Sequence, residues 1–156
     1  MALGQTLDNA KLIVAVGSGG VGKTTSAAAI ALAAARRGKK VLVLTIDPAR
    51  RLANSLGLAE FGNEATKINT TEIGSVSGEL WAMMLDSRST FDNLIHRVSP
   101  SEEARNRILN NHVYKHLSNT FAGSQDYMAT EVIYDLYESG KFDLLVLDTP
   151  PVKNAL

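Results

Sequence analysis

The chain has 156 residues and is 45% hydrophobic, with a mean hydropathy of -0.01, which is typical of one soluble globular domain spanning residues 1–156. Sixteen basic and sixteen acidic residues cancel, so the composition indicates no large cationic surface and we expect no nucleic-acid partner. The absence of cysteine excludes disulfides, thiolate zinc sites, iron–sulfur clusters and cysteine nucleophiles.

The N-terminal residues do not fit the pattern of a secretory signal. Met1–Asp8 has neither the basic start nor the apolar run of such a signal. The longest uncharged apolar stretch nearby, Ala27–Ala35, is far shorter than the roughly 20 residues that a membrane span needs. We therefore expect the protein to reside in the cytoplasm.

The first part of the chain predicts a strand–helix–strand unit. Lys11–Val16 and Val41–Ile46 are short apolar runs rich in β-branched residues, which is typical of strands buried on both faces. Between them, Lys23–Arg37 contains strong helix formers, and Gly38 is suited to end that helix. This order predicts two parallel strands joined by a right-handed crossover.

Two weaker elements are expected next. Asp47 followed by Pro48 is typical of the start of a short helix, which we expect to end at Ser55. Residues 60–78 are polar and lack a strong period, so we expect a loop with a short edge strand near Lys67–Asn69.

The rest of the chain predicts helices between two further strands. Glu79–Leu85 and Phe142–Leu147 are the strands, and the second of them leads directly into Asp148. Residues 88–139 are expected to be helical, with breaks at Pro100 and near Asn110. Strands alternating with helices predict an α/β fold with a mainly parallel sheet flanked by helices. Ligands of such sheets bind beyond the carboxyl ends of the strands.

A glycine-rich segment between the first strand and the first helix fits the phosphate-binding loop motif G-x-x-x-x-G-K-[ST]. Its glycines allow consecutive backbone N–H groups to surround phosphate oxygens, and the start of the helix adds partial positive charge. Lys23 is expected to reach the β- and γ-phosphates, Thr24 to ligate Mg²⁺, and Thr25 to contact the α-phosphate. The motif therefore predicts a P-loop nucleoside triphosphatase fold that binds a nucleoside triphosphate and Mg²⁺. The residues expected to bind the nucleotide are Gly17, Ser18, Gly19, Gly20, Val21, Gly22, Lys23, Thr24 and Thr25.

Three motifs resemble those of the arsenical pump-driving and tail-anchored-protein-targeting ATPases, which belong to the same variant P-loop class as the ParA and MinD ATPases. Gly17–Thr25 (GSGGVGKTT) resembles the variant P-loop, Thr45–Leu58 (TIDPARRLANSLGL) the switch I segment, and Asp148–Pro151 (DTPP) the switch II segment. Gly78–Asp86 matches a strand found between the two switches. The resemblance covers only the N-terminal half of the family's ATPase domain, so the fold is expected to be incomplete relative to the family.

The resemblance implies an ATPase that works as a homodimer closing around two ATP molecules. Lys23 and Asp47 would then be catalytic, with Asp47 positioning or activating the attacking water. Asp148 would hold the Mg²⁺ shell, directly or through water, and sense the γ-phosphate. The residues alone leave simpler interpretations open, since Asp47 would also serve as a helix cap and Asp148 as a turn residue before two prolines.

The chain departs from the family pattern at one residue and in its length. Ser18 occupies the position of the family's signature lysine, which reaches the partner subunit's phosphates, and Arg50, Arg51 and Lys153 are candidate substitutes. In the resembled family, the other half of the ATPase domain carries the client or metalloid site. We expect these 156 residues to lack that half, so a client protein or membrane partner would bind a region outside them.

Other functions remain open. They are a positioning ATPase of ParA or MinD type, a nucleotide-dependent interaction switch that hardly hydrolyses ATP, and, more distantly, a metabolic kinase. His112 and His116 have i, i+4 spacing but lack the glutamate of a zinc protease motif, so we expect no metal there.

Overall fold

The computed structural model describes residues 3–46, 51–56, 62–71, 74, 76–85, 95–96, 98–114 and 124–151, without the side chains of residues 51, 54 and 124–128. The chain divides into two compact units, one formed by residues 1–85 and 136–156 and the other by residues 86–135. The single domain expected from the chain length stays a prediction. Among the described helices, none is long and apolar enough to cross a membrane.

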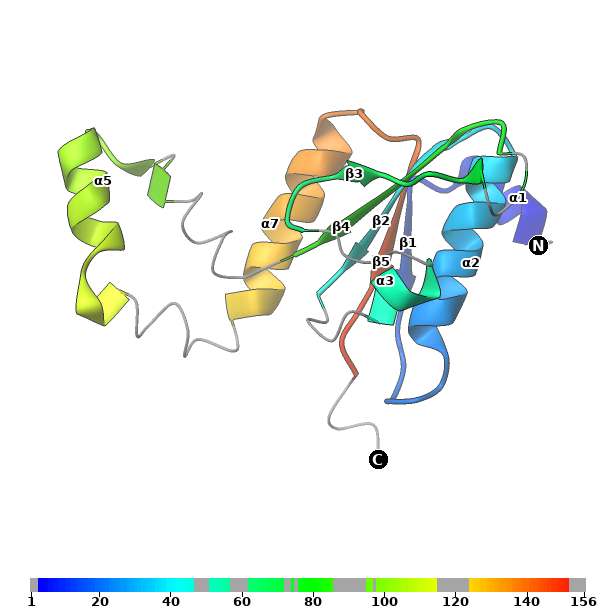
Figure 1. The fold of residues 1–156 in the computed structure, drawn as a ribbon, viewed down its shortest axis with the longest axis horizontal. Helices are drawn as coiled ribbons and strands as arrows, with labels where there is room; N and C mark the ends of the chain where they lie inside the picture. The colour runs from blue at the N-terminus through cyan, green and yellow to red at the C-terminus, as the bar shows by residue number, and fades with distance from the viewer. Residues whose placement is uncertain are drawn as a thin grey trace. The chain divides into compact units, whose positions relative to one another are not determined.

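The first unit contains a five-stranded sheet with the order β1-β5-β2-β4-β3 (Figure 1). β1, β5, β2 and β4 are parallel to their neighbours, whereas the two-residue edge strand β3 is antiparallel to β4. The mainly parallel sheet confirms the predicted α/β class, and β3 lies where the sequence predicted a short edge strand. The strands are β1 (Leu12–Ala15), β2 (Lys40–Thr45), β3 (Thr66–Lys67), β4 (Glu79–Met84) and β5 (Leu144–Asp148).

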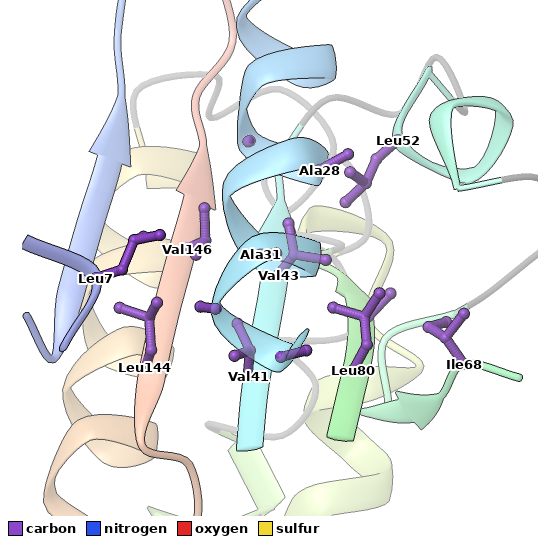
Figure 2. Close-up of a cluster of buried hydrophobic side chains, with 14 of the residues drawn as sticks. Leu7, Ala28, Ala31, Val41, Val43, Leu52, Ile68, Leu80, Leu144 and Val146 are labelled. Carbon is purple, nitrogen blue, oxygen red and sulfur yellow. The ribbon is translucent and has the colours of Figure 1, made fainter. Parts of the chain in front are cut away.

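Helix α2 (Lys23–Arg36) packs against one face of the sheet through small side chains. Ala27, Ala31, Ala34 and Ala35 are fully buried, and alanine allows the helix axis to approach the strands closely. Figure 2 shows valines and leucines of β2, β4 and β5 meeting this helix. The helix ends at Arg36, one residue before the predicted Arg37, and Gly38 follows it with a φ of 91°, in the left-handed region that glycine adopts readily.

Alternate residues of the central strands point to the opposite face of the sheet and are buried as well. Leu42 and Leu44 of β2 and Leu145 of β5 are at most 2% exposed. Burial on both faces accounts for the continuous apolar runs in these strands, since a parallel sheet leaves no solvent-facing side that would favour polar residues.

Two short helices complete the described part of the first unit. α1 (Leu3–Asn9) was not predicted, and it is joined to the core by Leu7, which is 3% exposed. α3 (Arg51–Ser55) confirms the predicted short helix, and its Leu52 lies beside Ala28 of α2 (Figure 2). The Asp47–Pro48 start predicted for this helix lies outside the described residues.

The second unit contains α5 (Glu102–Leu109), while α7 (Ser124–Glu138) crosses the boundary between the units. Ser101 begins α5 by accepting a hydrogen bond from the backbone N–H of Ala104 at 3.2 Å. The helix ends at Asn110, which confirms the second predicted break.

Candidate functional site

The predicted phosphate-binding loop connects the end of β1 to the start of α2. Gly20 and Gly22 have φ values of 78° and 85°, a conformation that strains other residues. Gly22 is the N-cap of α2, and no side chain forms a capping hydrogen bond there. The N–H groups of the first helical turn therefore remain available to an anion, at the positive end of a 14-residue helix.

The lysine of the motif folds back over its own loop. Lys23 Nζ donates a hydrogen bond to the backbone carbonyl oxygen of Ser18 at 2.8 Å. This contact holds the ammonium group beside the loop that is expected to surround the phosphates. The lysine is therefore in place to pair with a phosphate oxygen after exchanging a single neutral acceptor.

A carboxylate at the end of β5 connects the loop to the sheet. Asp148 is 1% exposed, and its Oδ2 accepts a hydrogen bond from Thr24 Oγ1 at 2.8 Å. The same Oδ2 accepts a second hydrogen bond from Thr45 Oγ1 at 3.3 Å. The register explains this convergence, because Asp148 is the neighbour of both Ala15 in β1 and Thr45 in β2. Strand pairing thus brings the carboxylate to the first turn of α2.

Thr24 and Asp148 fit a magnesium site by the chemistry of their side chains. Mg²⁺ prefers oxygen donors and takes only one or two from the protein, with water and phosphate oxygens completing its shell. A hydroxyl and a carboxylate oxygen 2.8 Å apart, next to the phosphate-binding loop, provide such a set. Among the described residues no group of three or more His, Cys, Asp or Glu side chains could hold a metal ion by itself.

An open cleft of about 600 Å³ lies over the loop. Its volume is within the range of small-molecule sites. The cleft is lined by Gly19, Gly20, Gly22, Lys23, Thr24, Thr25, Ser55 and Pro151.

The structure brings together the sequence-predicted residues that it describes. Gly17–Thr25 form one loop and helix start, and Asp148 contacts Thr24 across the sheet end. Asp47, Arg50 and Lys153 lie outside the described residues. For Arg51 the structure gives only the backbone, as the first residue of α3.

The second histidine of the pair also lies outside the described residues. His112 is described and exposed, whereas His116 is not described. The expectation that this pair binds no metal therefore stays a prediction.

Three residues of the site were missed by sequence reasoning. Ser55 and Pro151 line the cleft, and Thr45 donates to Asp148. Thr45 carried a usable signal, because it is the one polar residue in the apolar run Val41–Ile46. A polar side chain in a strand buried on both faces needs a hydrogen-bond partner.

Comparison with known proteins gives a family match over most of the chain. The family described as Anion-transporting ATPase matches residues 10–156. The ATPase GET3 of Mycosarcoma maydis is 29% identical over 140 residues, which cover 90% of this chain and 39% of that protein. The ATPase GET3 of Malassezia globosa is 31% identical over 146 residues, covering 94% of this chain and 40% of that protein.

A third relative matches at a similar level. The ATPase ASNA1 homolog of Plasmodium vivax is 28% identical over 162 residues, covering 99% of this chain and 38% of that protein. The chain thus spans about two fifths of the length of these three relatives. Because the family match runs from residue 10 to residue 156, the chain belongs to the anion-transporting ATPase family, as its three motifs predicted.

Proposed function

We propose that this chain binds ATP with Mg²⁺ and forms the nucleotide half of an ATPase of the arsenical pump-driving or tail-anchored-protein-targeting type. The observation that carries the proposal is the hydrogen bond between Thr24 and Asp148, which joins the first turn of α2 to the carboxyl end of β5. This bond brings a phosphate-binding loop, a hydroxyl and a buried carboxylate together at the carboxyl ends of the parallel strands. The family match supports the same assignment.

Each part of the site has a chemical task in this proposal. The loop N–H groups and Lys23 bind the phosphate oxygens and orient the γ-phosphate. Thr24 and Asp148 would hold the metal, which would supply positive charge that offsets the negative charge developing during phosphoryl transfer. Asp47 orients the attacking water, as the resemblance of the switch I segment implies.

Replacement of Lys23 by alanine tests nucleotide binding. We expect Lys23→Ala to weaken ATP binding by about 10- to 100-fold, because a hydrogen bond to a charged group contributes about 1.5–3 kcal/mol. Calorimetric titration with ATP in the presence of Mg²⁺ measures the change. Lys141→Ala, which removes an exposed lysine before β5, is the matched control. Unchanged ATP affinity in Lys23→Ala would contradict the assignment of the loop.

Asp47→Asn tests hydrolysis separately from binding, when ATP turnover is measured beside the calorimetric titration. The amide preserves the size of the side chain but is a poor acceptor for a proton from water, so we expect ATP turnover to fall while ATP affinity is retained. Equal turnover in the wild-type protein and Asp47→Asn would remove Asp47 from the mechanism.

A second candidate function is a nucleotide-dependent switch that dimerises on ATP but hydrolyses it very slowly. Ser18 favours it, because its exposed side chain carries no charge where the resembled family has a lysine. Sedimentation with and without ATP, together with turnover, distinguishes the two functions. If Arg50, Arg51 or Lys153 supplies the missing cation, its replacement by alanine lowers turnover, whereas unchanged rates in all three variants favour the switch.

The proposed ATPase type also implies that the protein binds a client. By resemblance, the client would be a tail-anchored membrane protein or a metalloid anion, and its site would lie in a region that the relatives possess beyond the part matched here. Residence in the cytoplasm also stays a prediction.

A further inference from the structure

Thr45 and Asp148 are the two buried polar or charged residues in the part of the chain that the structure describes. They are 2% and 1% exposed, and both lie at the carboxyl ends of central strands. We propose that Thr45 is a positioning residue, whose hydroxyl orients the Asp148 carboxylate and thereby sets the affinity of the nucleotide site for Mg²⁺. This inference rests on the proposed ATP and Mg²⁺ binding and deepens it.

The geometry makes Thr45 a direct neighbour of the carboxylate. Thr45 is paired with Asp148 in the register of β2 and β5, and paired residues of parallel strands project to the same face. Thr45 Oγ1 donates to Asp148 Oδ2 at 3.3 Å, and Thr24 Oγ1 donates to the same oxygen at 2.8 Å. Two hydroxyls, one from the first turn of α2 and one from the end of β2, thus hold one carboxylate oxygen.

The residue type is informative because the position is buried. Valine would fit the strand as well as threonine, since both are β-branched and of similar size. A hydroxyl in an apolar interior costs free energy unless it forms a hydrogen bond. Nearby positions of β2, such as Val43 and Leu44, are fully buried and apolar. Threonine at position 45 is therefore explained by its bond to Asp148 rather than by packing.

The hydrogen bonds form a continuous path from β2 to α2. Thr45 orients Asp148, and Asp148 accepts the hydrogen of Thr24, so the lone pairs of the Thr24 oxygen remain available to a cation. Groups that orient metal ligands in this way tune metal affinity without touching the metal. Loss of the Thr45 hydroxyl should consequently affect the Mg²⁺ dependence of nucleotide binding more than binding without the metal.

The test compares Mg²⁺ titrations of the full chain and its variants. ATP binding is measured by calorimetry over a range of MgCl₂ concentrations and again in EDTA, and thermal unfolding is recorded in parallel. In Thr45→Val we expect the MgCl₂ concentration for half-maximal ATP binding to rise about 3- to 10-fold, the range expected for one lost hydrogen bond. ATP affinity in EDTA stays within twofold, and Thr45→Ser restores the wild-type titration.

Two further variants keep the test decisive. Val43→Ala removes buried volume from the same strand without touching a hydroxyl, so it should lower the melting temperature and leave the Mg²⁺ titration unchanged. Thr45→Ala should shift the Mg²⁺ titration as Thr45→Val does, which covers the case in which valine prevents folding.

The outcomes separate this inference from the proposed function. An unshifted Mg²⁺ titration in the Thr45 variants, or an equal shift in Val43→Ala, overturns the role of Thr45 while the proposed function stands. A wild-type chain that binds no ATP at any Mg²⁺ concentration overturns both.

Discussion

Gly78 lies where the segment before β4 meets the turn between α2 and β2. Its N–H donates to Ala35 O at 2.9 Å, and the N–H of Glu79 donates to Lys39 O at 3.1 Å. A Cβ atom on Gly78 would clash with Lys39 O and would lie 2.6 Å from Gly38 C. These neighbours are backbone atoms, and Lys39 O also accepts the hydrogen bond from Glu79, so they cannot move aside without cost in free energy.

We therefore expect Gly78→Ala to lower the free energy of unfolding by about 1–3 kcal/mol, the usual cost of overpacking a tight site. Denaturation in urea measures the change. Gly62→Ala is the matched control, because no heavy atom lies within 4 Å of a Cβ built there. The control should stay within about 0.5 kcal/mol of the wild-type protein. Equal destabilisation by both substitutions would show that space at Gly78 is not the cause.

At the scale of elements, α1 depends on contacts made by its side chains. Arg37, after the end of α2, donates from Nε to Asp8 Oδ1 at 2.9 Å. Lys39 Nζ donates to the backbone oxygen of Asp8 at 2.7 Å. A seven-residue helix is too short to be stable alone, so these bonds and Leu7 hold it in place.

The Asp8–Arg37 pair makes the attachment of α1 sensitive to acid. The hydrogen bond from Arg37 lowers the pKa of Asp8 below its ordinary value of 3.8. Because the pKa is lower in the folded state than in the unfolded state, the pair stabilises folding above pH 3.8, and this stabilisation is lost as the pH falls through the folded pKa. Protection of α1 amides against hydrogen exchange should decrease at acid pH relative to the sheet.

Asp8→Asn provides the control for this acid effect. The amide cannot titrate, so the protection of α1 in this variant should be low at neutral pH and should change little on acidification relative to the sheet. Exchange is followed by mass spectrometry after correction for the intrinsic pH dependence of amide exchange. An unaltered pH profile in Asp8→Asn would assign the acid sensitivity to another group.

Sequence patterns predicted the elements whose signals are local. The strands β1, β2, β4 and β5 appeared as apolar runs, and the phosphate-binding loop as a contiguous motif. α1 was missed because its sequence, LGQTLDN, has no strong helical period and is stabilised by residues about 30 positions away.

The role of Thr45 was missed for a related reason. Its contact with Asp148 spans 103 positions and exists because β5 lies between β1 and β2 in the sheet. Periodicity predicts that strands are buried and parallel, but not which strands are neighbours. The sequence therefore predicted Thr24 and Asp148 as ligands of the site, but not Thr45, the residue proposed to orient Asp148.

At the scale of the molecule, the edge of the sheet at β1 carries exposed apolar side chains. Leu12 and Val14 of β1 are 39% and 44% exposed, and alternation places them on one face of the strand. Val16, directly after the strand, is 69% exposed. Among the described strands, β1 pairs with β5 alone. An apolar edge strand with unpaired backbone groups favours edge-to-edge association.

We expect the isolated chain to associate at high concentration through this edge, without a requirement for ATP. Val14→Lys should reduce that association, because a lysine on an edge strand must be desolvated before a second strand can pair. Sedimentation velocity over a concentration series, in the absence of nucleotide, measures the effect. Val113→Lys is the control, since Val113 is also exposed, at 62%, but lies outside the sheet. Equal loss of association in both variants would indicate a general effect of charge, and persistence of association in Val14→Lys would exclude the β1 edge as its site.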